Sequence, residues 1–376
     1  MKETSCYIHI PFCDHKCIYC DFYSIITSEN IPSFLVSLKN EISYYAVKYS
    51  SDRLLTSIFF GGGTPSLMNP DYLEEIMTSI KSNFNVSDSA EVTMETNPGT
   101  VDKEKIRKFK EAGINRISIG IQSFHEDELK FLTRIHNGET AINTVNDATD
   151  VGFDNINIDL IFNLPGQSKE KWLSNLKQAI ILPITHLSAY SLILERGTIL
   201  NKMVLDGKVF LEDEDHDADL YESTVEFLTA NGFYQYEVSN FTKPGYESVH
   251  NNAYWHYKDY IGFGTSAHSF INGKRWWNYS SLKKYIHEIK KCGHAMANIE
   301  QLSHAEIHDE YVMLSLRSSG LDLADYRNRF NDDWIVRNNS YLKKLTDEKL
   351  IFLDNNKIKL SKNGYFVCDE ILKNLL

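Results

Sequence analysis

The sequence has few of the residues that mark disordered, fibrous or disulfide-stapled chains. Its 376 residues include only 8 prolines, 19 glycines and 6 cysteines. Disordered and collagen-like sequences are much richer in proline and glycine, and small disulfide scaffolds are much richer in cysteine. With 42% hydrophobic and 24% charged residues, the composition is typical of a globular protein. At roughly 100 to 200 residues per domain, this length predicts two or three domains.

Long apolar runs and an excess of basic charge are also absent. No apolar run approaches the roughly 20 residues that cross a bilayer, and Pro183 interrupts the longest, at 179–184. The first residues carry no charged-then-apolar leader, so we expect a cytoplasmic protein without a transmembrane segment. Acidic residues outnumber basic ones by 51 to 39, and the net charge of −12 disfavours binding to nucleic acid.

Strand-like and helical segments alternate over the first 240 residues. One helical segment begins after Asp102, a good N-cap residue, and stops at Gly113. Strands separated by helices of this length predict parallel βαβ units, here a partial (βα)6 barrel in an α/β fold. The six expected strands are 6–10, 57–60, 91–96, 116–123, 155–162 and 186–194.

One face of most of these strands is polar. In the fourth strand, three isoleucines alternate with Ser118, Gly120 and Gln122. Parallel strands that are covered on both faces are normally apolar throughout. If the aliphatic face lies under the helices, the polar face lines the barrel interior and needs a polar ligand to satisfy it. An open sheet with one hydrated face is the alternative.

The pattern changes after about residue 240. An aromatic-rich segment follows and is expected to be connecting structure. The last part has helical segments at 304–316 and 333–346, and then a hairpin around the turn at 354–356. This order predicts a smaller, mostly helical, winged-helix-like domain with a docking or lid role. The expected parts of the chain are 1–240, 241–300 and 301–376.

Three of the six cysteines, Cys13, Cys17 and Cys20, stand within eight positions just after the first expected strand. Parallel barrels place their sites at this end of the strands. Three thiolates this close can wrap one metal centre, and an iron–sulfur cluster held by only three leaves one iron open for a small chelating molecule. A structural zinc site with His9 or His15 as fourth ligand, or three unrelated core cysteines, are the alternatives.

This C-x-x-x-C-x-x-C spacing resembles that of the radical S-adenosylmethionine (SAM) superfamily. The resemblance is stronger to its oxygen-independent coproporphyrinogen oxidase branch and covers nearly the whole chain. It implies a 4Fe-4S cluster on Cys13, Cys17 and Cys20, with SAM chelating the open iron. In that superfamily the reduced cluster cleaves SAM to a deoxyadenosyl radical.

The resemblance also implies a set of SAM contacts. The glycine triplet Gly61-Gly62-Gly63, followed by Thr64, ends the second expected strand and would hold the SAM amino group. Each of the other matching residues could instead be an ordinary structural polar residue. These other positions are Tyr7, Tyr19, Glu95, Gln122, Arg134 and Asp159.

A third motif, His250-Asn251-Asn252-Ala253-Tyr254-Trp255, resembles the H-N-x-x-Y-W signature of the haem chaperone subfamily known as HemW. The resemblance implies haem binding by His250, Tyr254 and Trp255. Histidine or tyrosine can ligate haem iron, and flat aromatic rings can cover a porphyrin face. The alternative is that these side chains pack the junction between domains.

Two functions compete: an oxidase that decarboxylates coproporphyrinogen, and a haem carrier. The oxidase pattern has a further cysteine two positions after the third ligand, whereas this chain has Phe22. The chain also starts only twelve residues before Cys13, without the longer arm of the oxidases. Both features favour the carrier. Its expected partners are haem-accepting proteins such as respiratory haem enzymes and an electron donor for the cluster, with peripheral membrane association during delivery.

Overall fold

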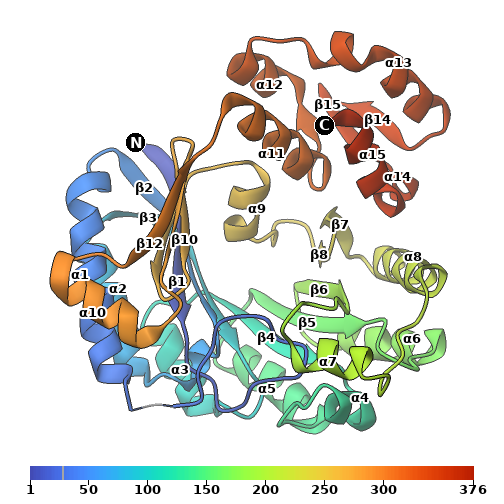
Figure 1. The fold of residues 1–376 in the computed structure, drawn as a ribbon. Coiled ribbons are helices and arrows are strands. Elements are labelled where there is room, and N and C mark those ends of the chain that lie inside the picture. The colour runs from blue at the N-terminus through green and yellow to red at the C-terminus, as the bar shows by residue number, and fades with distance from the viewer. Residues whose placement is uncertain (28) are drawn as a thin grey trace.

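The computed structural model describes residues 1–27 and 29–376. Its first part is a curved parallel sheet (Figure 1), in which each of the six barrel strands pairs with the next along the chain. The predicted partial (βα)6 barrel is therefore confirmed. The strands are β1 (Lys2–Ile10), β2 (Arg53–Gly62), β3 (Asn85–Thr96), β4 (Arg116–Gln122), β5 (Ile156–Phe162) and β6 (His186–Ser191).

Helices cover the aliphatic face of this sheet. Ile117, Ile119 and Ile121 are fully buried in the main hydrophobic core, under helices whose apolar residues complete it. The predicted caps are present, since the Asp102 side chain accepts a hydrogen bond from the Lys105 amide. The helices are α1 (Ile31–Tyr49), α2 (Pro70–Asn83), α3 (Lys103–Glu111), α4 (Glu126–Phe131), α5 (Gly138–Asp150), α6 (Lys169–Ile180), α7 (Ile199–Leu205) and α8 (Glu214–Ala230), with a 3₁₀ turn at Pro65–Leu67.

The segment predicted to be connecting structure instead extends the same sheet. β9 pairs in parallel with β1, and β8 pairs antiparallel with β6, so the sheet grows at both edges. The buried residues Ile261 and Phe263 alternate with glycines, and a Cβ at Gly262 would lie 2.2 Å from the His268 carbonyl oxygen. This close approach of two backbones explains why the sequence did not resemble a strand. The elements are β7 (Tyr234–Glu237), β8 (Asn240–Thr242), α9 (Val249–Trp255), β9 (Tyr260–Gly264), β10 (His268–Ile271), β11 (Lys274–Asn278), α10 (Leu282–Cys292) and β12 (Met296–Gln301).

The C-terminal part has its own hydrophobic core and lies beyond α9 from the barrel (Figure 1). The predicted hairpin is confirmed, because β14 and β15 pair antiparallel. No described helix is long and apolar enough to cross a membrane. The three-part division of the chain stays a prediction. The elements here are α11 (His304–Leu316), β13 (Leu321–Asp322), α12 (Leu323–Phe330), α13 (Trp334–Asp347), β14 (Ile351–Asp354), β15 (Lys357–Leu360), α14 (Lys362–Phe366) and α15 (Cys368–Leu375).

Candidate functional site

A cavity of about 500 Å³ lies inside the curved sheet. Ser118, Gly120 and Gln122 of β4 line it, which confirms that the polar strand face forms the barrel interior. Most of the residues predicted to contact the cluster or SAM also line this cavity. They are Cys13, Cys17, Tyr19, Cys20, Gly62, Gly63, Thr64, Glu95, Gln122, Arg134 and Asp159. We call the end of the cavity that holds the three cysteines the barrel mouth.

The cysteine loop is tied to the end of β2 by backbone hydrogen bonds. The Gly63 amide donates to the Ile10 carbonyl at 2.8 Å, and the Thr64 amide donates to the Phe12 carbonyl at 2.8 Å. The Cys13 sulfur lies 3.4 Å from the Thr64 hydroxyl oxygen. The three cysteines are half-buried and free, so their thiols are available to the cavity.

Burial raises the pKa of the Cys13 thiol and raises that of Cys20 to about 11. Such thiols need a nearby positive centre to become thiolates. Within 1–27 and 29–376, no three His, Cys, Asp or Glu side chains are close enough to hold a single metal ion. A four-iron cluster takes each thiolate on a different iron and is wider than one ion. The three cysteines therefore fit such a cluster better than the alternative of a structural zinc ion.

The glycine triplet at the end of β2 has no room for side chains. Gly62 has a φ of 109°, and a Cβ there would lie 2.5 Å from the His9 ring. A Cβ at Gly63 would lie 2.6 Å from the Phe12 carbonyl oxygen, and one at Gly61 would crowd Phe59 at 2.9 Å. Only glycine lets this backbone pass so close to the cysteine loop and leaves its polar groups open to a ligand.

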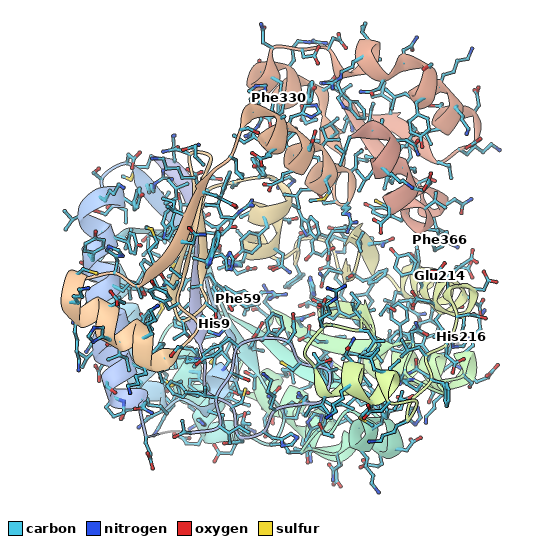
Figure 2. The ribbon with its side chains drawn as sticks, in the orientation of Figure 1. His9, Phe59, Glu214, His216, Phe330 and Phe366 are labelled. Carbon is cyan, nitrogen blue, oxygen red and sulfur yellow. The ribbon has the colours of Figure 1, made fainter. Side chains whose placement is uncertain are left out.

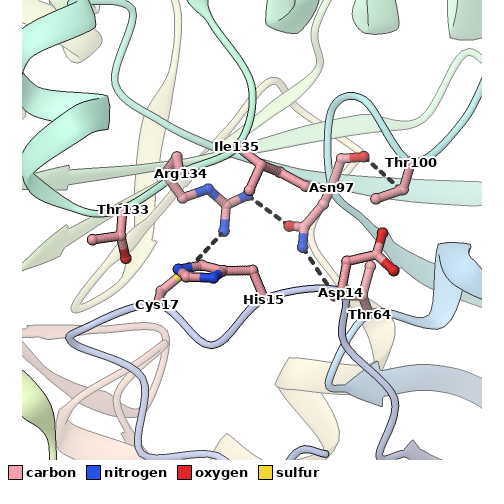
Figure 3. A pocket seen from close by; sticks show the side chains of 9 residues that line it. All are labelled: Asp14, His15, Cys17, Thr64, Asn97, Thr100, Thr133, Arg134 and Ile135. Atoms are coloured by element: carbon pink, nitrogen blue, oxygen red, sulfur yellow. Dashed lines mark hydrogen bonds between the residues drawn. The ribbon is translucent and has the colours of Figure 1, made fainter. Parts of the chain in front are cut away.

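A chain of hydrogen bonds crosses the barrel mouth (Figure 3). The Asn97 amide donates to the Thr64 hydroxyl at 3.0 Å, and Arg134 donates to the Asn97 side-chain oxygen at 2.7 Å. Arg134 also donates to the Gly120 carbonyl at 2.7 Å and points another nitrogen at the Cys17 sulfur, 3.6 Å away. Its buried Nε has no partner in the described chain. Arg134 is thus positioned both to stabilise a thiolate at Cys17 and to bind an anionic group.

Two acidic residues, Glu95 and Asp159, line the inside of the cavity. Glu95 accepts a hydrogen bond from the Gly62 amide at 3.1 Å, and burial together with the charge of Asp159 raises its pKa to about 8. Asp159 accepts from Ser118 and Asn157, yet burial still raises its pKa. Both groups would be stabilised by a ligand that supplies hydroxyl donors or positive charge.

Tyr7 and Gly61 are not among the residues that line this cavity, although they adjoin Phe59 and Glu95, which do. The Tyr7 hydroxyl oxygen lies 3.2 Å from Nδ1 of His9, and its ring stacks on Phe59 at 6.2 Å. Figure 2 shows His9 and Phe59 close together beside the sheet. Tyr7 therefore packs beside the glycine triplet, and a Cβ at Gly61 would lie 3.1 Å both from the Tyr7 ring and from the Glu95 carboxylate.

The HNxxYW motif forms most of α9, which closes the opposite end of the barrel. We call this end, made by Glu91, Arg116 and α9, the barrel floor. The Glu91 carboxylate accepts from the Ser248 hydroxyl at 3.3 Å and from the amides of Val249 and His250 at 3.1 Å. Glu91 therefore satisfies free backbone amides in the first turn of α9 and offsets the positive end of the helix dipole.

His250 does not reach the barrel mouth and does not fit as a haem-iron ligand. Its ring is 2% exposed, with Nδ1 2.9 Å from the Ser57 hydroxyl and Nε2 3.0 Å from the Tyr254 hydroxyl. Burial and the charge of Arg116 lower its pKa to about 3. Both nitrogens thus have protein partners, and the ring stacks on Phe59 at 4.9 Å. Tyr254 shares this packing, and Trp255 is half-buried at the end of α9.

Sequence reasoning missed three polar residues that the cavity brings together: Asn97, Arg116 and Asn251. Arg116 starts β4 on the same face as Ser118 and Gln122, so strand alternation could have found it. Asn251 lies within the HNxxYW motif, but only the helix geometry shows that it, and not His250, lines the cavity.

The class of protein is defined by fold, cavity and cysteine loop together. Residues 7–179 match the Radical SAM superfamily, and residues 302–367 match the HemN C-terminal domain. Among solved structures, coproporphyrinogen III oxidase (HemN) from Escherichia coli superposes with a TM-score of 0.85 at 24% identity, over 100% of this chain and 90% of that one. That likeness shows a shared fold.

Relatives narrow the class to one family. Heme chaperone HemW from Bacillus subtilis is 34% identical over 98% of this chain and 97% of its own length. Heme chaperone HemW from Escherichia coli is 41% identical over 72% of this chain and 71% of its own length. A Danio rerio mitochondrial radical S-adenosyl methionine domain-containing protein is 33% identical over 100% of this chain and 87% of that protein. The chain belongs to the heme chaperone HemW family of radical SAM proteins.

Proposed function

We propose that this protein binds haem and transfers it to acceptor proteins, and that it carries a 4Fe-4S cluster with SAM at its open iron. The observation that carries the proposal is end-to-end similarity to proteins named heme chaperone HemW. Its acceptors would be haem proteins such as respiratory haem enzymes. An electron donor would reduce the cluster, and delivery would take place in the cytoplasm or at a membrane surface.

Cys13, Cys17 and Cys20 would hold the cluster at the barrel mouth. When bound, such a cluster supplies one electron to SAM. Arg134 would stabilise the Cys17 thiolate, and the open backbone of Gly62 and Gly63 would accept the SAM amino group. The other proposed SAM contacts are Tyr7, Tyr19, Gly61, Thr64, Glu95, Gln122 and Asp159.

Phe22 supports the carrier over the oxidase. The oxidase pattern has a cysteine at this position, and here an exposed phenylalanine (62%) lines the barrel mouth instead. A phenyl ring there offers apolar contact to a flat macrocycle and cannot supply a thiol. The oxidase remains the second candidate because its fold is shared over the whole chain.

Haem contact by Tyr254 and Trp255 would come from α9, which packs Tyr254 against His250 and Tyr260. No iron ligand is assigned to His250, because its two ring nitrogens are bonded to Ser57 and Tyr254.

The test uses anaerobically reconstituted protein in two parallel assays. In the first, haemin is added and its transfer from the protein to apomyoglobin is followed by the Soret band. In the second, the reduced protein is incubated with SAM and coproporphyrinogen III. Haem uptake and transfer without porphyrin formation supports the carrier. Conversion of coproporphyrinogen III without haem transfer would establish the oxidase instead.

A further inference from the structure

The barrel floor contains a buried cation that the proposed SAM contacts leave unused. Arg116 is 2% exposed and lines the cavity. Its Nε is buried and has no hydrogen-bond partner among the described residues. A buried guanidinium carries five donors, and leaving them unmade costs free energy.

The nearest carboxylates do not satisfy these donors. Glu91 lies 3.8 Å from the Arg116 Nε, which is beyond hydrogen-bond distance, and its oxygens already accept from Ser248, Val249 and His250. Asp159 accepts from Ser118 and Asn157. Glu91 therefore compensates the charge of Arg116 and leaves its hydrogen bonds open.

The open donors face a continuous path to the barrel mouth. The same cavity is lined by Cys20 and Phe22 at one end and by Arg116 and Asn251 at the other. Asn251 adds a side-chain amide to the lining of the same cavity, and this side chain makes no hydrogen bond within the described chain. The backbone amides of α9 are not part of this arrangement, since Glu91 and Ser248 occupy them.

We propose that Arg116 and Asn251 form a carboxylate-binding subsite at the barrel floor, which receives a propionate of the tetrapyrrole that the protein carries. This inference rests on the proposed function. A guanidinium binds a carboxylate through two parallel hydrogen bonds, and tetrapyrrole propionates are carboxylates on short flexible arms. The HNxxYW motif thereby contributes Asn251 to the ligand, while His250 fixes the helix that carries it.

The test compares haemin with its dimethyl ester, in which both propionates are neutral. Reconstituted protein is titrated with each by difference spectroscopy in the Soret region. We expect the wild type to bind haemin about tenfold more tightly than the ester. Arg116→Gln should bind haemin about tenfold more weakly than the wild type does. This variant should therefore bind haemin and the ester with equal affinity.

Asn251→Asp is a second test of the subsite, at a position where the substitution is expected to leave the fold intact. Position 251 is the third residue of α9, where an acidic side chain favours a helix start. The new charge should weaken haemin binding about fivefold and leave ester binding unchanged. Lys16→Gln, which removes a charge from the barrel mouth, is the matched control and should keep the full discrimination.

Any other result would contradict one particular part of the proposal. Equal binding of haemin and ester by the wild type overturns the subsite and leaves the haem carrier standing. Absence of haemin binding overturns both. If the preference for haemin over the ester disappears in Lys16→Gln and persists in Arg116→Gln, the carboxylate binds at the barrel mouth instead of the floor. A tenfold loss of SAM affinity in Arg116→Gln, with haemin discrimination retained, would assign the subsite to the SAM carboxylate instead.

Discussion

The two ends of the barrel differ in how completely their polar groups are satisfied. At the mouth, Glu95 lies beside the Gly62 amide with a raised pKa, and burial also raises the pKa values of the Cys13 and Cys20 thiols. At the floor, most polar groups are bonded within the protein, and Glu91 accepts hydrogen bonds from the Ser248 hydroxyl and from the amides of Val249 and His250.

This difference indicates that the barrel mouth binds ligands, whereas the barrel floor stabilises the fold. A polar group left unsatisfied inside a folded protein indicates a missing partner, whereas a satisfied one stabilises the protein itself. The barrel mouth is therefore suited to bind ligands, whereas the barrel floor is held together by its own hydrogen bonds apart from the side chains of Arg116 and Asn251. The contrast also shows that a sequence motif such as HNxxYW can serve mainly to hold a helix in place.

The largest expected effect is at the mouth. Replacing Cys13, Cys17 and Cys20 together by alanine should abolish iron and sulfide incorporation, because no other described thiol lines the cavity. Iron analysis after anaerobic reconstitution measures this. Cys292→Ala, at an exposed cysteine outside the site, is the control and should incorporate iron normally; unchanged iron in the triple variant would refute the assignment.

Glu95 should make SAM binding depend on pH. Its pKa of about 8 means that the carboxyl is mostly protonated below pH 8, and only the ionised form attracts the sulfonium charge of SAM. SAM affinity should therefore fall by up to about tenfold per pH unit between pH 8 and pH 6, and level off above pH 8. Equilibrium dialysis at several pH values measures this.

Glu95→Gln is the matched variant for this dependence. The amide keeps the shape of the side chain and cannot ionise, so its SAM affinity should be low and nearly flat over the same pH range. A wild-type profile as flat as that of the variant would show that Glu95 does not face the ligand.

At the floor, His250→Ala should act on stability. It removes the partner of two buried hydroxyls, those of Ser57 and Tyr254, and should lower the free energy of unfolding by about 2 kcal/mol. Iron content and SAM affinity should stay within about twofold of the wild type. Chemical denaturation measures the free energy of unfolding of this variant and of His287→Ala, a control at an exposed histidine. Loss of the cluster in a folded His250→Ala protein would contradict the separate roles of the barrel floor and the barrel mouth.

The smallest effect is expected for Ser57→Ala. Ser57 donates to Ser5 at 2.8 Å and contacts Nδ1 of His250 at 2.9 Å, so its loss should cost about 1 kcal/mol of unfolding free energy. A double-mutant cycle with His250→Ala should show coupling between the two positions. Strict additivity would mean that the Ser57–His250 contact does not stabilise the floor.

The barrel and the cysteine loop could be predicted because their signals are local. Alternation along β4 and β5 depends only on neighbouring residues, and three cysteines within eight positions are close in any fold. The hairpin at the C-terminal end was predictable for the same reason, since its turn lies between two short strands.

Contacts between distant segments were not predictable. The hydrogen bonds that Asn97 donates to Thr64 and that Arg134 donates to Asn97 join three loops that are brought together only when the sheet curves. Likewise, Gly262 and Gly264 weakened the strand signal of β9 because tight backbone packing, rather than side-chain alternation, defines that edge of the sheet. The meeting of Glu91 with α9 also spans more than 150 residues.

The central claim is that the three thiols of the barrel mouth hold a cluster with one iron open to SAM. Electron paramagnetic resonance of the dithionite-reduced, reconstituted protein, recorded with and without SAM, tests it most directly. We predict a 4Fe-4S signal that changes shape on addition of SAM and is absent from the triple alanine variant. A cluster signal that SAM leaves unchanged would contradict the claim.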